Sequence, residues 1–236
     1  MAASPTSGPA PTFPWVGDLL VSGNDDGVVT LTLDRPAKRN ALSIGLRDEV
    51  SDALDGLADD PDLKVLVLTG AGEVFSAGFD LKEFETADAG VLWASSDRFH
   101  HAVLRFPLPT IAAVNGPALA GGFDLAMLCD IRIASTAARF AHPEQAWADV
   151  VYSPLARAVG GGVANDLAMT GRSIDAAEAL ALGVVSQLHE PDAFAAAVAE
   201  AAAQVARAPR ANLLRTKAKA LARAQLPPVG TPTLDL

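Results

Sequence analysis

The chain has 236 residues, of which half are hydrophobic and 19% are charged. A chain of this length forms one large domain or two small ones, and its composition is too apolar for a disordered protein. The net charge of −10 has no basic stripe to offset it, which argues against a nucleic-acid partner. The composition therefore predicts a globular protein with a sizeable core.

Three sequence features bear on the cellular compartment. Cys129 is the only cysteine, so no intrachain disulfide can form and a reducing compartment is expected. The longest uncharged run, residues 106–123, contains three prolines and would make a poor membrane-spanning helix. Residues 1–17 are rich in Pro, Ser and Gly and do not read as a signal peptide, so we expect a flexible tail. Together these features predict a cytoplasmic protein without a membrane partner.

The first half of the chain alternates predicted strands with a predicted helix. Residues 27–36 alternate β-branched and apolar residues up to a proline, which is typical of a strand. Ser43 then begins a segment, ending near Ala58, that places leucine and valine at helical spacing. Residues 63–72 form an apolar run that ends in glycines, the pattern of a strand covered on both faces.

The alternation continues further along the chain. A helix is predicted over residues 89–105, and two more strands over residues 110–116 and 130–135. From Asp175 the chain becomes alanine-rich and helical, with an interruption at residues 183–188. Strands that alternate with helices predict an α/β domain, here with a mainly helical C-terminal part.

Two glycine-containing loops follow the predicted strands. In FSAGFDLKEF (residues 75–84), the Ala77-Gly78 pair allows a sharp turn from which the amide of Phe79 can point outward. In NGPALAGGFDLA (residues 115–126), glycines lead into a helix whose first amides lack intrahelical partners and lie at the positive end of its dipole. Two such N–H groups together can hold an oxygen that gains negative charge during a reaction.

Two carboxylates accompany these loops. Asp124 interrupts an otherwise apolar run, one turn into the predicted helix. Glu144 follows Pro143 in the segment ARFAHPEQAW (residues 138–147). An acid in the first turn of a helix is favoured by the helix dipole, so neither residue is diagnostic by itself.

Taken together, the three loops resemble those of the crotonase superfamily, the enoyl-CoA hydratase/isomerase family. The resemblance runs from about residue 28 to about residue 217. It rests on five motifs in the family's order, DRPAKRNAL, FSAGFDLKEF, PTIAAVNGPALAGGFDLAMLCDIRIAS, AHPEQ and AMTGRSIDAAEALALGVVSQL. Several long motifs in the correct order are far more specific than any one of them.

The resemblance implies an α/β crotonase (ClpP/crotonase-like) fold, a spiral of ββα repeats with a helical C-terminal region that mediates trimerisation. We therefore expect a tail at residues 1–17, a core at 18–190, a helical region at 191–226 and a second tail at 227–236. Typical members carry a further helical segment that closes the site, so closure of the acyl pocket is expected to differ here.

The resemblance also assigns site residues by position. It places the oxyanion-hole amides at Phe79 and Gly121 and the two acids at Asp124 and Glu144, which are 20 residues apart as in the family. The residues implied in CoA binding are Lys38, Arg39, Ala41, Ala77, Asp80 and Leu81.

The implied activity is hydration of a trans-2-enoyl-CoA to a 3-hydroxyacyl-CoA through an enolate of the thioester. Glu144 would be the main acid/base, and Asp124 would orient the water or share the proton. No metal or cofactor is expected beyond the coenzyme A of the substrate. The implied assembly is a homotrimer or a dimer of trimers.

Two departures from the family pattern keep alternatives open. Family hydratases usually have glutamate where this chain has Asp124; aspartate there occurs in double-bond isomerases, which often use a further acid, here Asp149. The segment at residues 148–162, which forms one wall of the acyl pocket in the family, is shorter than usual here. Tyr152 or Trp147 is expected to fill the space.

His142 is a further candidate site residue, because it precedes the Pro-Glu pair. Besides hydratase activity, the sequence leaves open an isomerase, a thioester or C–C hydrolase, and an acyl-CoA binder without catalysis. The last alternative belongs to a different functional class, and the presence of both acids argues against it.

Overall fold

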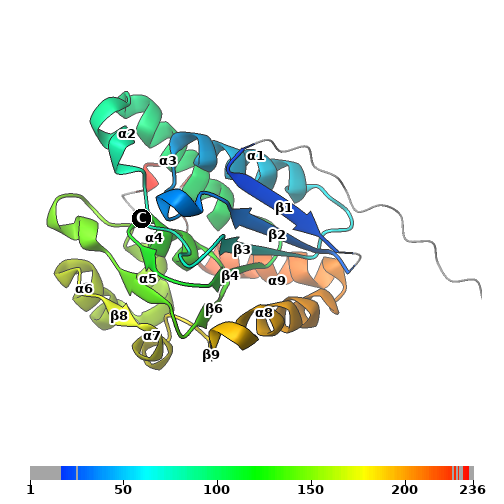
Figure 1. Cartoon of the computed structure of the whole chain (residues 1–236). Coiled ribbons are helices and arrows are strands. Elements are labelled where there is room, and N and C mark those ends of the chain that lie inside the picture. Colours follow the sequence, from blue (N-terminus) through cyan, green and yellow to red (C-terminus); the bar gives the residue numbers. More distant parts are fainter. Residues whose placement is uncertain (1–16, 25, 225, 227, 229–230, 234–236) are drawn as a thin grey trace, which may run out of the picture.

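The computed structural model describes residues 17–24, 26–224, 226, 228 and 231–233. Most of the predicted N-terminal tail, residues 1–16, lies outside the described part of the chain. A central sheet runs through the molecule, and helices cover both of its faces (Figure 1). Among the described residues, no helix is both long enough and apolar enough to cross a membrane.

The central sheet has the strand order β1-β2-β3-β4-β6-β9, and every pair in it is parallel except β1 with β2. The four strands predicted from sequence all form. β1 and β9 were not anticipated. The strands are β1 (Leu19–Gly23), β2 (Val28–Leu33), β3 (Val65–Gly70), β4 (Thr110–Val114), β6 (Ile131–Ser135) and β9 (Gln187–His189).

Apolar side chains leave the parallel strands on both faces of the sheet, as the continuous apolar runs predict. On one face, Val65 and Val67 pack with Ile111 against apolar residues of α8 (Pro191–Ala206). On the other face, the alternate residues Leu66 and Leu68 belong to the larger core beneath three helices. These are α1 (Ile44–Ala58), α3 (Ala89–Leu104) and α4 (Gly121–Leu128).

Local signals set the ends of several helices. The hydroxyl of Ser43 accepts a hydrogen bond from the amide of Leu46 at 3.2 Å, so α1 begins where its capping residue predicts. Gly160, with φ of +80°, separates α5 from α6. The other helices are α2 (Leu81–Thr86), α5 (Ser153–Val159), α6 (Gly161–Thr170), α7 (Ala176–Leu182), α9 (Arg210–Arg223) and the 3₁₀ turns η1 (Pro36–Lys38) and η2 (Pro143–Ala146).

A second, smaller sheet lies beside the central one. It contains β5 (Ala118–Leu119), β7 (Arg139–Ala141) and β8 (Ile174–Asp175), with β5 parallel to β7. The sequence did not indicate this sheet because its strands are two or three residues long, too short for a periodic pattern. It joins the loop before α4 to the loop after β7, the two loops that carry the predicted acids.

The described residues near the C-terminus dock against α3, although this segment was expected to be a tail. Thr233 is fully buried, and its hydroxyl and amide both donate to Oδ1 of Asp97. Since that hydroxyl proton is committed to Asp97, Nδ1–H of His100 donates to the Thr233 oxygen at 2.9 Å. The carbonyl of Thr231 contacts Nε2 of His101 at 3.0 Å.

Candidate active site

The three loops singled out in the sequence meet at a cavity of about 220 Å³. Its lining combines the loop after β3, the start of α4 and the loop after β7, together with parts of α2 and α3. Phe79, Gly121, Asp124 and Glu144 all contribute to this lining. The chain fold therefore brings the predicted oxyanion and acid residues to one place.

Backbone contact between two loops forms the oxyanion part of the site. Gly78 has φ of +89°, and a Cβ placed on it would lie 2.7 Å from Cβ of Ala120 and 3.1 Å from the amide nitrogen of Gly121. Only glycine fits this approach. Among the described residues, the amides of Phe79 and Gly121 have no hydrogen-bond acceptor. Two neighbouring N–H groups are thus free to bind an oxygen at the N-terminus of α4.

Ala120 adds local strain at this point. Its φ of +51° is unusual for a residue other than glycine, and its amide donates to the carbonyl of Ala141 in β7 at 2.9 Å. The hydrogen bond to β7 holds the turn that starts α4. The direction of the Gly121 amide is therefore coupled to the small sheet.

The side chain of Phe79 anchors the first oxyanion loop. Its ring lies 4.3 Å beneath the guanidinium of Arg47, and it stacks on the imidazole of His100 with the ring centroids 5.9 Å apart. Arg47 is fully buried and donates to Ser95 and to the carbonyl of Leu92. Burial lowers the pKa of Arg47, and burial followed by the charge of Arg47 lowers the pKa of His100 to about 3. His100 is therefore neutral.

Arg47 was not identified from the sequence as a residue that supports the site. Its position three and seven residues before Val50 and Leu54 places it on the apolar face of α1, and a cation on that face is an indication of a buried role.

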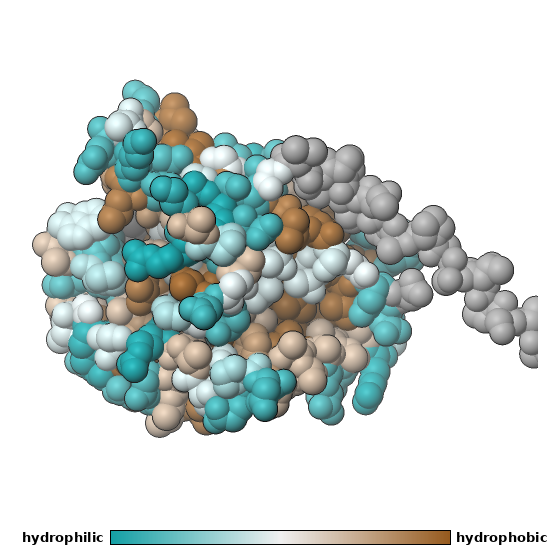
Figure 2. All heavy atoms as spheres, viewed as in Figure 1, coloured by the Kyte–Doolittle hydropathy of each residue, from teal (hydrophilic) through white to brown (hydrophobic). Residues whose placement is uncertain are grey.

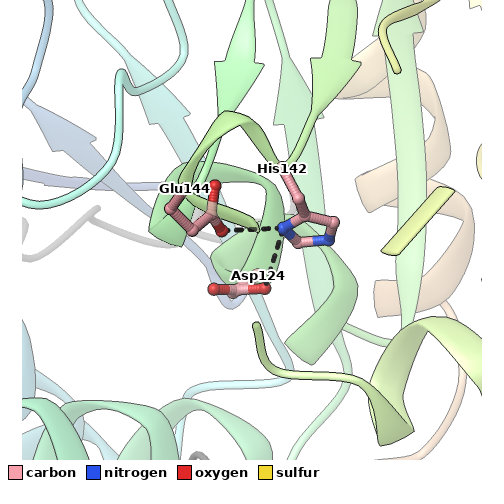
Figure 3. A group of neighbouring side chains, drawn as sticks. All are labelled: Asp124, His142 and Glu144. Atoms are coloured by element: carbon pink, nitrogen blue, oxygen red, sulfur yellow. Dashed lines mark hydrogen bonds and ion pairs between the residues drawn. The ribbon is translucent and has the colours of Figure 1, made fainter. Parts of the chain in front are cut away.

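The two acids approach each other around His142 (Figure 3). Asp124 is the fourth residue of α4, and Glu144 is the second residue of η2. Nδ1 of His142 lies 2.9 Å from Oε1 of Glu144 and 3.8 Å from Oδ1 of Asp124. All three side chains are buried, and Asp124 Oδ1 and Glu144 Oε2 have no hydrogen-bond partner. The imidazole is thus hydrogen-bonded to Glu144 and lies within ion-pair distance of Asp124.

Burial controls the protonation of this group. It raises the pKa of Asp124 to about 7, with the charge of His142 acting to lower that pKa and the charge of Glu144 acting to raise it. For His142, burial opposes the charge, but the hydrogen bond to Glu144 and the charges of both acids outweigh burial and raise its pKa. At neutral pH the cluster therefore holds protons that can be transferred.

The small sheet explains how distant residues come together here. Leu119 in β5 pairs with Ala141 in β7. Leu119 lies shortly before α4, and Ala141 is the residue before His142. Pro143 then starts the 3₁₀ turn η2 that points Glu144 back toward α4.

Asp124, His142 and Glu144 each offer one potential metal-ligand atom, and these atoms lie within 4.8 Å of one another. Two carboxylates and one imidazole form a donor set that divalent metals accept. The expectation that the site works without a metal or cofactor remains a prediction.

The residues implied in CoA binding divide into two groups. Ala77 and Leu81 line the cavity, and so does Asp149, the candidate third acid. The remaining four do not line it; they are Lys38, Arg39, Ala41 and Asp80.

Asp80 has structural partners of its own. It caps α2 through the amide of Lys82 and pairs with Arg35 at 3.3 Å. Lys38 and Arg39 are exposed, and the carbonyl of Arg39 accepts from the amide of Ala77, which connects the first loop to the oxyanion loop.

Aromatic side chains form the wall that faces α2 and α3. Phe84 and Trp93 line the cavity and were not identified from the sequence. Trp147 lines it as well, whereas Tyr152 lies outside the lining and donates to Asn165 at 2.6 Å. Of the two residues expected to fill the shortened wall, Trp147 is the one that reaches the cavity.

Known proteins are similar to this chain in sequence and in fold. Residues 23–231 match the family model of enoyl-CoA hydratase/isomerase. A Thermus thermophilus protein that carries the name of an enoyl-CoA hydratase is 38% identical over 206 residues, which are 83% of this chain and 81% of that protein. A 4-chlorobenzoyl coenzyme A dehalogenase from Arthrobacter is 36% identical over 78% of this chain and 71% of its own.

Solved structures agree with the sequence relatives. The crystal structure of an enoyl-CoA hydratase from Bacillus anthracis has a TM-score of 0.85 at 30% identity, covering 89% of this chain and 85% of that one. The family match, the relatives and the shared fold lead to one conclusion: the chain belongs to the enoyl-CoA hydratase/isomerase family, within the crotonase superfamily of acyl-CoA-processing enzymes.

Proposed function

We propose that this protein hydrates a trans-2-enoyl-CoA to a 3-hydroxyacyl-CoA. The observation that supports this proposal is the pair of buried acids, Asp124 and Glu144, beside two amides without acceptors at Phe79 and Gly121. The names of relatives agree with it, among them a mitochondrial enoyl-CoA hydratase from Pongo abelii that is 37% identical.

The two amides stabilise the charge that develops on the substrate. When the thioester carbonyl binds between Phe79 N–H and Gly121 N–H, its oxygen faces two fixed dipoles at the start of α4. Addition at C3 moves electrons onto this oxygen and forms the enolate. Loss of one such donor typically reduces the rate about 100- to 1,000-fold.

The acids divide the proton transfers between them. His142 donates to Glu144, so the Glu144 carboxylate is oriented as the base that takes a proton from water while the hydroxide adds to C3. Asp124, whose pKa is raised to about 7 by burial, is a source of the proton that C2 receives. Transfer of the captured proton from Glu144 to Asp124, past His142, then restores the starting state.

An isomerase that moves a double bond in an unsaturated acyl-CoA is the second candidate. Asp149 lines the cavity with Asp124 and Glu144, and a third acid offers another position for proton abstraction and return. A hydrolase and a non-catalytic binder are the remaining outcomes of the test below.

The same family membership supports several finer proposals. We infer a homotrimer or a dimer of trimers, a cytoplasmic location and a role in fatty acid metabolism, with CoA bound along the loops of Ala41, Ala77 and Leu81. Analytical ultracentrifugation tests the assembly directly.

The activity test follows the conjugated enoyl-thioester absorbance of crotonyl-CoA. Rapid loss of this absorbance is expected, and Glu144→Gln should slow it about 100- to 10,000-fold because a general acid/base is removed. Asp149→Asn serves as the control, since a hydratase does not need the third acid. If crotonyl-CoA binds but is not converted, the hydratase proposal fails, and β,γ-unsaturated acyl-CoA then tests the isomerase.

A further inference from the structure

We propose that the cavity is built for an acyl group that carries a flat aromatic ring. This inference rests on the proposed function only in taking the ligand to be an acyl-CoA. It is carried by four aromatic rings that line the cavity and contact one another, Phe79, Phe84, Trp93 and Trp147.

Phe84 is the centre of this aromatic cluster. The ring of Phe79 stacks on it with centroids 6.0 Å apart, and the rings of Trp93 and Trp147 meet it edge-on at 5.8 Å and 5.9 Å. Aromatic rings prefer these offset and edge-to-face arrangements at such separations. A further ring entering the cavity can therefore join the cluster in the same geometry.

The cluster draws its rings from separate parts of the chain. Phe79 precedes α2, Phe84 lies within it, Trp93 lies on α3 and Trp147 follows η2. The packing of any one of these helices does not by itself bring the four rings together. Their convergence on one cavity is therefore better explained by a ligand than by the packing of one element.

Two side chains at the rim remain uncovered. Trp147 is 59% exposed and Leu81 is 63% exposed, although both line the cavity. In the space-filling view, a few hydrophobic side chains are visible among hydrophilic ones at the α2 end of the molecule (Figure 2). Exposed apolar side chains at the rim of a cavity are typical of a binding site.

The volume of the cavity favours a ring over a long chain. An apolar cavity of about 150 Å³ accommodates benzene, and the 220 Å³ here leaves room for one ring and a short linker to the thioester. A long linear chain exceeds this volume, whereas a four-carbon chain does not fill it.

The part of the aromatic wall that comes from α2 and α3 carries no charge. Among the described lining residues, the only charged or acidic groups are Asp124, on α4, and Glu144 and Asp149, which flank Trp147 on the segment after β7. His100, which also lines the cavity, is neutral because burial and then the charge of Arg47 lower its pKa to about 3. An uncharged, aromatic acyl group is the chemical class that fits this wall.

The test measures binding of saturated acyl-CoAs, which cannot be hydrated. Calorimetric titration of the full chain compares 3-phenylpropanoyl-CoA with nonanoyl-CoA, which has the same number of acyl carbons, and with butanoyl-CoA. The phenyl ligand is expected to bind at least about threefold more tightly than either, since each favourable ring contact contributes roughly two- to tenfold. Turnover of crotonyl-CoA and cinnamoyl-CoA is followed in parallel.

Two variants assign the preference to the rings. Phe84→Leu and Trp93→Leu keep an apolar side chain but remove a ring, and each should weaken 3-phenylpropanoyl-CoA binding about two- to tenfold while butanoyl-CoA binding changes less than about twofold. Met169→Leu is the control, because Met169 lies on α6 and is exposed away from the cavity. Circular dichroism verifies that each variant is folded.

The outcomes separate this inference from the proposed function. Equal or weaker binding of the phenyl ligand overturns the aromatic preference even if crotonyl-CoA is hydrated. A phenyl preference that survives both ring removals overturns it as well. A phenyl preference without any hydration supports the inference and rejects the hydratase, whereas failure of every acyl-CoA to bind rejects both.

Discussion

Nδ1 of His142 lies 2.9 Å from Oε1 of Glu144, and the same nitrogen lies 3.8 Å from Oδ1 of Asp124. The imidazole does not line the cavity, so it acts on the acids from behind. Packing of its ring against Phe123 at a centroid distance of 4.7 Å holds it there. His142 is therefore positioned to orient Glu144 without contacting the substrate.

Removal of the His142 imidazole should lower kcat but leave substrate binding nearly unchanged. His142→Phe is expected to lower kcat about tenfold to 100-fold, because Glu144 loses the contact that orients it, while KM changes less than about twofold. His142→Gln keeps an amide that can donate and should recover part of the loss. Steady-state kinetics with crotonyl-CoA measures both; an unchanged kcat in His142→Phe would contradict the orienting role.

Asp124 should make folding stability depend on pH. Burial raises its pKa in the folded state to about 7, well above the value of about 4 in an unfolded chain. The folded state binds the extra proton, so the stabilisation is complete below about pH 4 and is lost as the pH rises through 7. Asp124→Asn mimics the protonated form and removes this loss.

Urea unfolding of wild type and Asp124→Asn between pH 5 and pH 8 tests the sign. The free energy of unfolding of wild type should decline relative to the variant by roughly 1–3 kcal/mol over this range. A parallel pH dependence for the two proteins would mean that Asp124 does not carry the proton.

The approach of the two oxyanion loops is expected to be intolerant of a methyl group. Gly78→Ala places a Cβ 2.7 Å from Ala120 and forces a residue other than glycine to adopt φ of +89°. The loops must move apart, and kcat should fall about 100-fold or more because the two amides no longer converge. Gly45→Ala is the control, since a Cβ there meets nothing within 4 Å. Retention of wild-type kcat in Gly78→Ala would argue against an oxyanion role for these loops.

Docking of Thr233 on α3 should contribute to stability. Thr233→Val keeps the shape but removes the hydroxyl that donates to Asp97 and accepts from His100, and we expect a loss of about 1–3 kcal/mol in the free energy of unfolding. Thr231→Val is a matched control, because Thr231 contacts His101 through its backbone carbonyl and should change stability by less than about 0.5 kcal/mol. Equal effects of the two substitutions, measured by urea unfolding, would show that the hydroxyl network is not the cause.

Local features of this chain were predictable from the sequence because their causes lie within a few residues. The capping hydroxyl of Ser43 and the apolar run of β3 each act on the residues next to them. The positions of Phe79 and Gly121 at one cavity followed from the family's motif order.

Other features depend on contacts between distant segments, and a sequence pattern does not contain these contacts. The position of His142 between the acids requires the pairing of β5 with β7, and each contributes only two or three residues. The aromatic cluster and the docked Thr233 likewise arise only when α3 packs against its neighbours. Such long-range relationships were visible only in three dimensions.

The pairing of β5 with β7 has a consequence for how this scaffold diversifies. It connects the acids and the oxyanion turn through main-chain hydrogen bonds, which depend little on which side chains the strands carry. The rings of Phe84 and Trp93, by contrast, come from α2 and α3, outside this connection. Substitutions in the aromatic wall on α2 and α3 can therefore change which acyl group binds without changing the geometry of the reacting groups. Specificity and chemistry can then evolve on separate parts of the chain.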